Sequence, residues 1–506
     1  MLTLELTERG SSAGLFNMNS RIIRSALISP LLLCLVWTAR ADVRLPALIS
    51  DNMVLQQKMA APVWGWADEG EEIKVTFQGK TAKTKTKNGK WMVKLSRLKA
   101  GGPDNLVVEG KNRIEIKNVL VGEVWVASGQ SNMEWPLKSS YEPANDIASC
   151  GNPQLRLFLV QKAKANSPAE DVKGQWKECD SSSVAGFSAV AYYFGRDLQK
   201  ARKVPVGMIG TYWGGSPAEV WMSQQALESN PDYKREILDT YTEAVQKADP
   251  KQRPGWKPTE LYNGMIAPVI PYGIQGAIWY QGESNAGRAE QYRSLFADMI
   301  RNWRHDWGQG DFTFLAVQLA PWDKGKKRSL ETIAEKTGDS DWAELREAQW
   351  LATRNLPKVG MAVITDVGDK DDIHPNKKEP VGARLALAAR GIAYGEKIEY
   401  SGPIYKKMRV KDSQAILSFE HIDGGLLAQG GELKGFSICG PDKKFVWAHA
   451  EIQGDTVVVS SPQVSEPVAV RYGWSDFPIV NLWNKSDLPA SPFRTDDFPM
   501  VTARKK

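Results

Sequence analysis

Ser131 stands in a turn where its hydroxyl could act as a nucleophile. The apolar run at residues 124–127 is typical of a buried strand, and the polar turn 129–132 follows it at once. A serine hydroxyl reacts readily only when a base accepts its proton and hydrogen-bond donors stabilise the oxyanion. Most turn serines merely bond to nearby backbone. A catalytic role for Ser131 therefore depends on a base and donors supplied from elsewhere in the chain.

His374 is the histidine that could serve as this base. It follows the apolar run 359–365 and lies in the acidic segment 366–375. Of the other three histidines, His305 is expected in the last turn of an amphipathic helix, where a cation is favourable, and two lie in a C-terminal β-rich region. We therefore expect His374 to accept the Ser131 proton.

The apolar run 204–210 is followed by two glycines and a helix-start pattern. Ser216 suits the N-cap position, Pro217 suits the first helical turn, and Glu219 lies three residues beyond the cap. The pattern predicts a helix that begins just after Gly215, where free N–H groups and the helix dipole favour an anion. We expect the Gly215 N–H to help form an oxyanion hole.

The apolar run 274–280 is followed by a dense polar segment. Gln281, Glu283 and Asn285 fall within five residues, which a neutral connector would not need. The Gln281 amide can donate to an oxyanion, and the Glu283 carboxylate can accept a hydrogen bond from an imidazole. Serine, histidine, carboxylate and backbone donors are the groups required for acyl transfer, in which an acyl-enzyme forms and is then hydrolysed.

Strands and helices alternate in the region that carries these residues. Helical spacing is clearest at residues 292–303, where apolar side chains recur every three or four positions. The alternation predicts a parallel sheet covered on both faces, hence a three-layer α/β/α domain over residues 120–394. Ligands bind at the carboxyl ends of parallel strands, so the polar segments should meet at one sheet edge. The expected strands are residues 121–127, 204–210, 274–280, 312–319 and 359–365.

Two β-rich regions flank this domain. Residues 42–119 contain short apolar runs separated by turn residues such as Asn88 and Gly89, which favours a small β-sandwich. Residues 395–506 return to a similar pattern. The stretch 473–494 is too aromatic for a loose tail, and we expect it to pack back on the core.

Four different short blocks of sequence lie, in this order, at the expected strand ends: residues 129–132, 214–215, 279–285 and 372–375. In this order they resemble the SGNH/GDSL hydrolases, and more closely the sialate O-acetylesterase family. The similarity extends over nearly the whole chain beyond residue 41. It implies an SGNH-type fold with Ser131 as nucleophile and His374 as base. It also implies an oxyanion hole formed by the N–H groups of Ser131 and Gly215 and a third-block side chain, for which we take Gln281.

Several groups could orient the His374 imidazole. The general pattern of the superfamily has an aspartate three residues before the histidine, which is Asp371 here. Asp372 lies beside it, and Glu283 could reach from the third block. A backbone carbonyl would leave a two-residue dyad. We rank Asp371 first and Glu283 second.

The resemblance implies hydrolysis of acetyl esters on sugars, with O-acetylated sialic acid as the first expected substrate. A sialic acid carboxylate could bind a cation such as Arg288, and Asn132 and Asn285 are the other expected substrate contacts. Acetylated xylan or another plant glycan is the nearest alternative substrate. The serine–histidine pair argues against a non-catalytic glycan-binding protein, and the sequence shows no lid-like apolar helix of a lipase.

Composition excludes other classes of function. A net charge of +6 over 506 residues, without a dense basic block, argues against a nucleic-acid partner. No C-x-x-C or H-E-x-x-H spacing points to a metal site, and the chemistry needs no cofactor. Cys150, Cys179 and Cys439 are expected as buried free thiols, although the first two could close a disulfide. The sequence predicts no particular oligomeric state.

Residues 1–41 have the pattern of a secretory signal peptide. Two arginines precede an apolar run at residues 25–37, and an A-x-A cleavage site ends at Ala41. The run is too short to span a bilayer as a helix, so no integral membrane span is expected. We expect cleavage after Ala41 and export to the periplasm or the cell exterior. We rank Met18 above Met1 as the true start, because it gives the leader an n-region of normal length.

Overall fold

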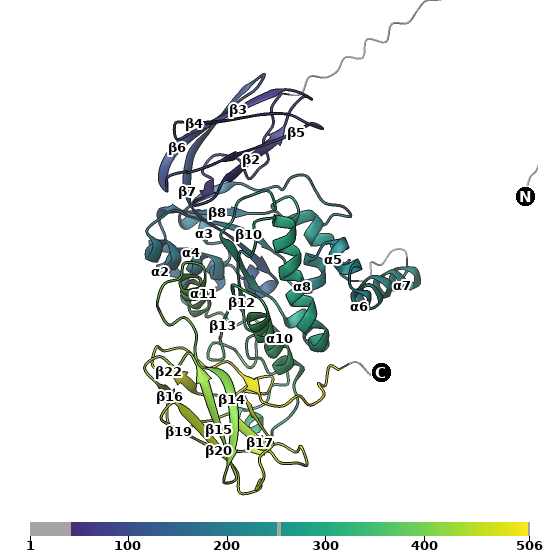
Figure 1. The fold of residues 1–506 in the computed structure, drawn as a ribbon, viewed down its shortest axis with the longest axis vertical. Helices are drawn as coiled ribbons and strands as arrows, with labels where there is room; N and C mark the ends of the chain where they lie inside the picture. Colours follow the sequence, from purple (N-terminus) through teal and green to yellow (C-terminus); the bar gives the residue numbers. More distant parts are fainter. Residues whose placement is uncertain (1–41, 250–254, 504–506) are drawn as a thin grey trace, which may run out of the picture. The chain divides into compact units, whose positions relative to one another are not determined.

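A computed structural model describes residues 42–249 and 255–503. It contains an N-terminal β unit, a central α/β unit and a C-terminal β unit (Figure 1). This confirms the expected α/β class with additional β-rich units. The expected signal peptide, residues 1–41, lies outside the described residues.

The N-terminal β unit follows from the alternation of its side chains. Its strands are β1 (Val54–Gln56), β2 (Ala61–Trp66), β3 (Glu72–Phe77), β4 (Lys80–Lys85), β5 (Lys90–Leu95) and β6 (Gly101–Glu109). β2 pairs with β5, and β3 pairs with β4 and β6, all antiparallel. Every second side chain of β5 is buried, because strand side chains alternate between two faces. Asn88 and Gly89 before β5 have φ of 54° and 71°, as the expected tight turn requires.

One long strand, β7 (Arg113–Gly129), joins this unit to the central sheet. Its first part pairs antiparallel with β6. Its last part lies between β10 (Val206–Tyr212) and β11 (Gly276–Tyr280), parallel to both. The domain boundary expected at residue 119 therefore falls inside a continuous strand.

The central sheet has the strand order β13-β12-β11-β7-β10-β8-β9. Its remaining strands are β8 (Asn152–Leu159), β9 (Trp176–Cys179), β12 (Thr313–Val317) and β13 (Val359–Ala362). Neighbours are parallel except β9, which runs antiparallel to β8 at the edge. A strand lies at each of the expected runs. β8 was not expected, because Arg156 interrupts its apolar residues; its guanidinium is buried and donates to Asn52 and Asn118.

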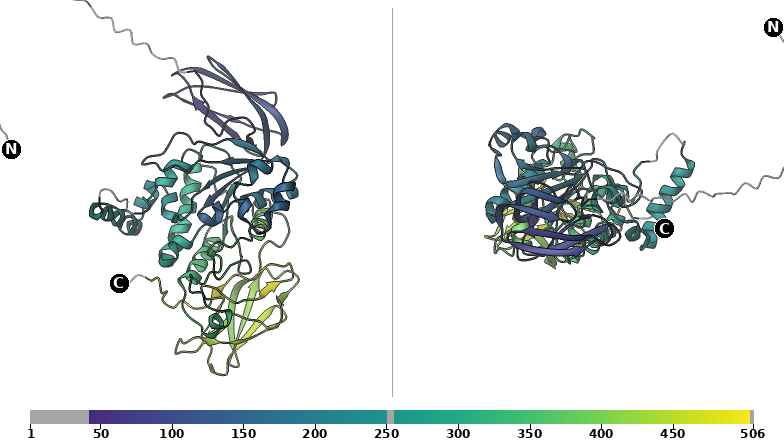
Figure 2. Two further views of the ribbon diagram at one scale, coloured as in Figure 1. Left: turned by 180° about the vertical axis from the view of Figure 1, so that it is seen from behind. Right: turned by 90° about the horizontal axis from the view of Figure 1, so that it is seen from above.

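Helices cover both faces of this sheet, which confirms the three-layer arrangement (Figures 1 and 2). α4 (Ala189–Arg202) and α11 (Glu379–Ile392) share one core with Trp125 and Ala127 of β7. α8 (Ala289–Trp307) and α10 (Asp341–Asn355) share the other with Val124 and Val126. The periodic apolar side chains of α8 are all buried, as their spacing predicts.

Shorter helices connect the larger elements. They are α1 (Ser131–Glu134), η1 (Leu137–Ser139), α2 (Pro143–Ser149), α3 (Ser181–Val184), η2 (Ala218–Trp221), α5 (Gln224–Glu228), α6 (Pro231–Tyr233), η3 (Lys234–Asp239), α7 (Thr240–Lys247), η4 (Tyr262–Ile266), η5 (Glu283–Arg288) and α9 (Leu330–Glu335). η3 and η4 are π-helical, and the other η elements are 3-10 helices. Three of them, α1, η2 and η5, are the next elements after strands β7, β10 and β11, and α1 and η5 carry polar residues of the expected site.

The C-terminal β unit contains two four-stranded antiparallel sheets, β14-β15-β20-β19 and β18-β17-β21-β23. Its strands are β14 (Ile404–Lys411), β15 (Gln414–Glu420), β16 (Leu426–Ala428), β17 (Phe436–Cys439), β18 (Val446–Trp447), β19 (His449–Gln453), β20 (Thr456–Ser460), β21 (Ala469–Tyr472), β22 (Leu482–Asn484) and β23 (Phe493–Arg494). The segment after β21 contacts α10: the fully buried Arg346 guanidinium donates to the backbone oxygens of Ser475 and Asp476 at 2.7 and 2.8 Å.

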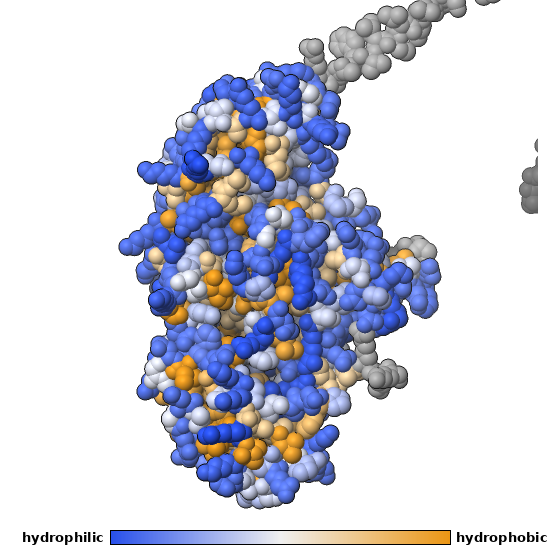
Figure 3. Space-filling model, in the orientation of Figure 1, coloured by the Kyte–Doolittle hydropathy of each residue, from blue (hydrophilic) through white to orange (hydrophobic). Residues whose placement is uncertain are grey.

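None of the described helices combines the length and the apolar character needed to cross a bilayer. On the face shown in Figure 3, hydrophobic residues are dispersed among hydrophilic ones. The three cysteines of the described chain, Cys150, Cys179 and Cys439, are buried free thiols, so the disulfide alternative is not realised.

Candidate active site

The turn that carries Ser131 depends on a glycine at the end of β7. Gly129 has φ of +138°, and a Cβ at this position would lie 2.2 Å from the Tyr280 backbone oxygen. Only glycine fits this close approach between β7 and β11. The Gln130 N–H then donates to the same Tyr280 oxygen at 3.0 Å. Ser131 begins helix α1, where backbone N–H groups lack an intrahelical acceptor.

His374 meets Ser131 across a separation of 243 positions in the sequence. Its Nε2 lies 2.8 Å from Ser131 Oγ, within hydrogen-bond distance. The Trp135 indole stacks on the imidazole at 5.4 Å between ring centres and an interplanar angle of 21°. Burial lowers the pKa of His374 and Lys378 lowers it further, whereas Asp372 raises it. A lowered pKa favours the neutral imidazole, which can accept the serine proton.

Asp372 is the carboxylate beside this imidazole. Its Oδ1 lies 3.6 Å from His374 Nδ1 and accepts a hydrogen bond from the His374 backbone N–H at 2.8 Å. Asp371, ranked first from the sequence, pairs with Lys370 at 2.5 Å and is largely exposed. Glu283, ranked second, accepts from Asn132 Nδ2 at 2.6 Å. The structure thus brings Asp372 to the histidine in place of the two preferred acids, because Asp371 pairs with Lys370 and Glu283 accepts from Asn132.

Gly215 follows Gly214, which packs against Ser131. A Cβ at the neighbouring Gly214 would be 3.3 Å from Ser131 Cβ, and the Gly214 N–H donates to Glu134 Oε2 at 2.7 Å. Gly215 is exposed with φ of +74°, and its N–H makes no backbone hydrogen bond within the described chain. That N–H is therefore free to point at an anion.

The expected helix start at Ser216 is wrong. The Ser216 hydroxyl donates to the Trp213 backbone oxygen at 2.7 Å and accepts from Trp221 Nε1 at 2.9 Å, so it caps no helix. Pro217 precedes the short 3-10 helix η2, which has no side-chain cap. Any oxyanion stabilisation by Gly215 must come from its own N–H group, because no long helix contributes a dipole there.

Gln281 and Asn285 belong to a buried hydrogen-bond network. Gln281 Nε2 donates to Asn285 Oδ1 at 2.7 Å and to the Ser216 backbone oxygen at 3.3 Å. Asn285 Nδ2 donates to Glu219 Oε2 at 2.9 Å, and its Oδ1 accepts from the Ala218 N–H. Both N–H donors of the Gln281 amide are therefore used within the protein, and Asn285 is only 1% exposed. The two side chains join the third block to the loop that carries Gly215.

Arg288 and Asn132 are likewise occupied by protein groups. Arg288 pairs with Glu219 at 2.6 Å and donates to Gln291 at 2.7 Å, with 40% of its side chain exposed. Asn132 is fully buried and contacts Glu283, Ile373 and Lys378. Among the expected substrate contacts, only Arg288 is accessible, and its charge is already balanced by Glu219.

The structure adds residues that the sequence did not single out. Trp135 follows the Ser131 motif and could have been found from that position alone. Trp213 and Trp256 pack edge to face at 5.6 Å, and Lys162 lies 5.3 Å from the Trp213 ring centre. Lys378, buried four residues after His374, gave no signal because isolated lysines are usually exposed.

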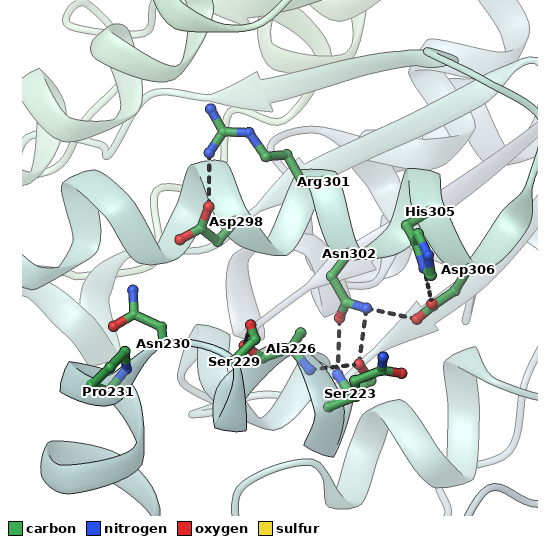
Figure 4. A pocket seen from close by; sticks show the side chains of 11 residues that line it. Ser223, Ala226, Ser229, Asn230, Pro231, Asp298, Arg301, Asn302, His305 and Asp306 are labelled. Atoms are coloured by element: carbon green, nitrogen blue, oxygen red, sulfur yellow. Dashed lines mark hydrogen bonds and ion pairs between the residues drawn. The ribbon is translucent and has the colours of Figure 1, made fainter.

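A cavity of about 770 Å³ opens beside α1, with Glu134, Pro136, Phe187 and Tyr212 among its lining residues. Figure 4 shows another, of about 550 Å³, between α5 and α8. Polar side chains of the latter are paired with one another, Asn302 with both Ser223 and Asp306. No residue of the expected site lines the cavity in Figure 4, whereas the first adjoins the nucleophile helix.

Comparison with known proteins agrees with this geometry. Residues 121–390 match the model of a carbohydrate esterase family described as sialic acid-specific acetylesterase. The sialate O-acetylesterase of Homo sapiens is 30% identical over 513 residues, which cover 92% of this chain and 95% of the human chain. The chain belongs to this family. The sialate O-acetylesterase of Rattus norvegicus is 29% identical over 519 residues, covering 89% and 94% of the two chains.

The similarity to this acetylesterase family also holds for the three-dimensional fold, as a solved structure shows. A carbohydrate acetylesterase from Xanthomonas citri is 41% identical, with a TM-score of 0.80 that spans 90% of this chain and 100% of that one. The resemblance drawn from the four sequence blocks is confirmed, and with it the SGNH-type fold. The chain is a carboxylic ester hydrolase that acts on sugar esters. The non-catalytic alternative is thereby set aside.

Proposed function

We propose that this esterase removes O-acetyl groups from sialic acid through an acyl-enzyme on Ser131. His374 Nε2 accepts the hydroxyl proton while Ser131 Oγ bonds to the acetyl carbon. The sugar oxygen then leaves with that proton. His374 next deprotonates a water, which attacks the acetyl-serine and releases acetate and free Ser131. The observation that carries the proposal is the 2.8 Å contact between His374 Nε2 and Ser131 Oγ.

The backbone N–H groups of Ser131 and Gly215 stabilise the tetrahedral oxyanion in this proposal. Ser131 follows β7 and Gly215 follows the neighbouring parallel strand β10. Gly214 packs against Ser131. Neither group needs a side chain, so the oxyanion site does not require Gln281. Asp372 supports the imidazolium that forms when His374 takes the proton, through its charge at 3.6 Å from Nδ1.

Two observations support a sialic acid ester as the substrate. The mammalian relatives are named sialate O-acetylesterases. In addition, two aromatic rings lie beside the nucleophile turn: the Trp213 N–H donates to the Gly129 backbone oxygen at 3.0 Å, and Trp256 packs edge to face on Trp213. Aromatic faces pack on sugar rings. The lysines over these two rings are already paired within the protein, Lys162 with Glu134 and Lys164 with Glu260.

The first prediction concerns Ser131→Ala. The variant removes the nucleophile but no buried packing, so acetate release should fall by several orders of magnitude with the melting temperature unchanged. The exposed Ser139→Ala serves as the control and should keep full activity. The assay compares O-acetylated sialic acid, acetylated xylan and a long-chain ester. Persistent activity in Ser131→Ala refutes the acyl-enzyme, and faster release from xylan would favour a plant glycan substrate.

We also propose that the enzyme is exported to the periplasm or the cell exterior. The support is the order of a basic segment, the apolar run 25–37 and the A-x-A site that ends at Ala41. Export would place the esterase where acetylated glycans of other cells are accessible. Residues 42 onward then form the mature protein.

A further inference from the structure

Asn132 links the turn of the nucleophile to the loop of the base. It follows Ser131 in α1 and is fully buried. Its Nδ2 donates to the backbone oxygen of Ile373, the residue before His374, at 3.0 Å. The same amide group donates to Glu283 Oε1 at 2.6 Å. A single side chain therefore spans the two segments whose relative position sets the Ser131–His374 distance.

Lys378 binds the oxygen atom of the Asn132 side-chain amide. Its Nζ donates to Asn132 Oδ1 at 2.5 Å, and the residue is only 1% exposed. Nζ also lies 5.3 Å from the Tyr280 ring centre and 5.7 Å from that of Trp135. Trp135 is the ring that stacks on His374. One amino group thus contacts both the residue after Ser131 and the ring beside the base.

Burying this amino group is costly, and Glu283 is the charge that offsets the cost. Burial lowers the pKa of Lys378 to about 7, although Glu283 and Asp372 raise it. Burial likewise raises the pKa of Glu283, against hydrogen bonds that include Asn132 and against the charge of Lys378. Glu283 Oε2 is buried without a hydrogen-bond partner in the described chain. A buried pair of charges that costs folding stability and lies beside the reacting groups indicates a functional role for that pair.

We propose that Lys378 is a positioning residue of this esterase, which acts through Asn132 to hold Ser131 and the His374 loop in register, with Glu283 as its buried counter-charge. The inference rests on the proposed function, because the Ser131–His374 pair is what Lys378 positions. It gives Asn132 and Glu283 a supporting role in place of the substrate-binding and acid roles expected from the sequence. None of the three needs to touch the substrate.

The charge of Lys378 also acts on the base itself. The titratable groups around its Nζ are Glu283 of η5 and two residues of the loop before α11, Asp372 and His374. After burial, Lys378 is what keeps the pKa of His374 low, while Asp372 opposes it. Removing the lysine charge therefore raises the His374 pKa. Because activity needs the neutral imidazole, the acidic limb of kcat/KM then moves to higher pH.

The experiment compares Lys378→Met with Lys377→Met in the full chain, with p-nitrophenyl acetate as the substrate. Lys378→Met should lower kcat by about 10²-fold, the effect of roughly 1 Å of misplacement near reacting groups, with little change in KM. Its acidic limb should lie at higher pH. Lys377 is exposed and lies over the Tyr141 ring at 5.6 Å, so Lys377→Met should match the wild type.

A double variant separates positioning from folding. Lys378→Met alone leaves Glu283 buried without its counter-charge, which lowers stability. Lys378→Met with Glu283→Gln removes both charges and should recover the melting temperature but not kcat. If the double variant recovers both, or if Lys378→Met keeps the wild-type kcat and pH profile, the lysine has no positioning role.

Two measurements separate failure of this inference from failure of the proposed function. Activity that survives in Ser131→Ala would refute the acyl-enzyme itself, whatever Lys378 does. The His374 pKa can be read without turnover from the imidazole Cε1–H signal in NMR, assigned with His374→Asn among the four histidines of the chain. A higher His374 pKa in Lys378→Met supports the inference, and an unchanged one contradicts it.

Discussion

The His374 imidazole has one close polar partner on Nε2 and none of hydrogen-bond length on Nδ1 in the described chain. Asp372 Oδ1 lies 3.6 Å from Nδ1, beyond a hydrogen bond, yet it accepts from the His374 backbone N–H at 2.8 Å. The carboxylate therefore acts through its charge and through the shape of the loop. This geometry fits a serine–histidine dyad with an adjacent acid.

Asp372→Asn is predicted to change the pH profile of the enzyme. The Asp372 charge raises the His374 pKa, so its removal lowers that pKa. The imidazole then stays neutral to lower pH, and the acidic limb of kcat/KM moves to lower pH. Stopped p-nitrophenyl acetate assays across pH measure this. Asp371→Asn, at an exposed carboxylate paired with Lys370, should leave the limb in place; a shift in that variant alone would restore Asp371 as the acid.

The role of a single residue could be predicted from the sequence only where it follows from the residue type and from its place after a strand. Ser131 and His374 follow strands, and parallel strands bring their carboxyl ends together, so their meeting could be foreseen. Gln281 and Asn285 have the right donors, but the sequence does not show that Gln281 donates to Ser216 and Asn285, or that Asn285 donates to Glu219. Lys378 was missed because its burial depends on the complete fold.

Among the elements, the end of β7 is where local backbone geometry constrains the site most. Gly129 pairs with both Tyr212 of β10 and Tyr280 of β11, so its backbone is enclosed by neighbours on two sides. The next residues form a turn whose Gln130 side chain accepts from the Gly282 and Ser284 N–H groups. The nucleophile is held by the sheet on one side and by the third block on the other.

Gly129→Ala is predicted to displace this turn. The new Cβ would lie 2.2 Å from the Tyr280 backbone oxygen, at a φ of +138° that alanine rarely adopts. Strain of this kind costs about 1–3 kcal/mol, so the melting temperature and kcat should both fall. Denaturant unfolding and ester hydrolysis measure the two effects. Gly151→Ala, where nothing lies within 4 Å of the new Cβ, is the control, and equal behaviour of both variants would contradict the argument.

The elements themselves were mostly predictable, because periodicity reports burial. The apolar face of α8 and the strands β7, β10, β11, β12 and β13 follow directly from their spacing. The helix expected at Ser216 fails because the hydroxyl bonds to Trp213 and Trp221, a tertiary contact that the capping pattern cannot reveal. β8 was hidden by Arg156, whose burial depends on amides from the N-terminal β unit.

For the whole molecule, the sequence predicts a processed chain. If residues 1–41 are a signal peptide, the exported protein should begin at Asp42, and intact-mass analysis of secreted material measures this. Replacing both arginines before the apolar run with glutamate should retain the precursor in the cell. The matched control is the same double exchange at two exposed lysines of the C-terminal β unit, Lys407 and Lys411. A secreted chain that starts far from Asp42 would refute the cleavage site.

The unbroken course of β7 has a practical consequence for anyone who shortens this protein. Arg113 to Gly129 form one strand, paired with β6 and β1 at one end and with β10 and β11 at the other. Cutting at residue 120 to obtain a minimal hydrolase would strip β7 of half its length and uncover the edges that β1 and β6 now occupy. Unpaired edges promote aggregation. The enzyme should therefore be expressed with its N-terminal β unit attached.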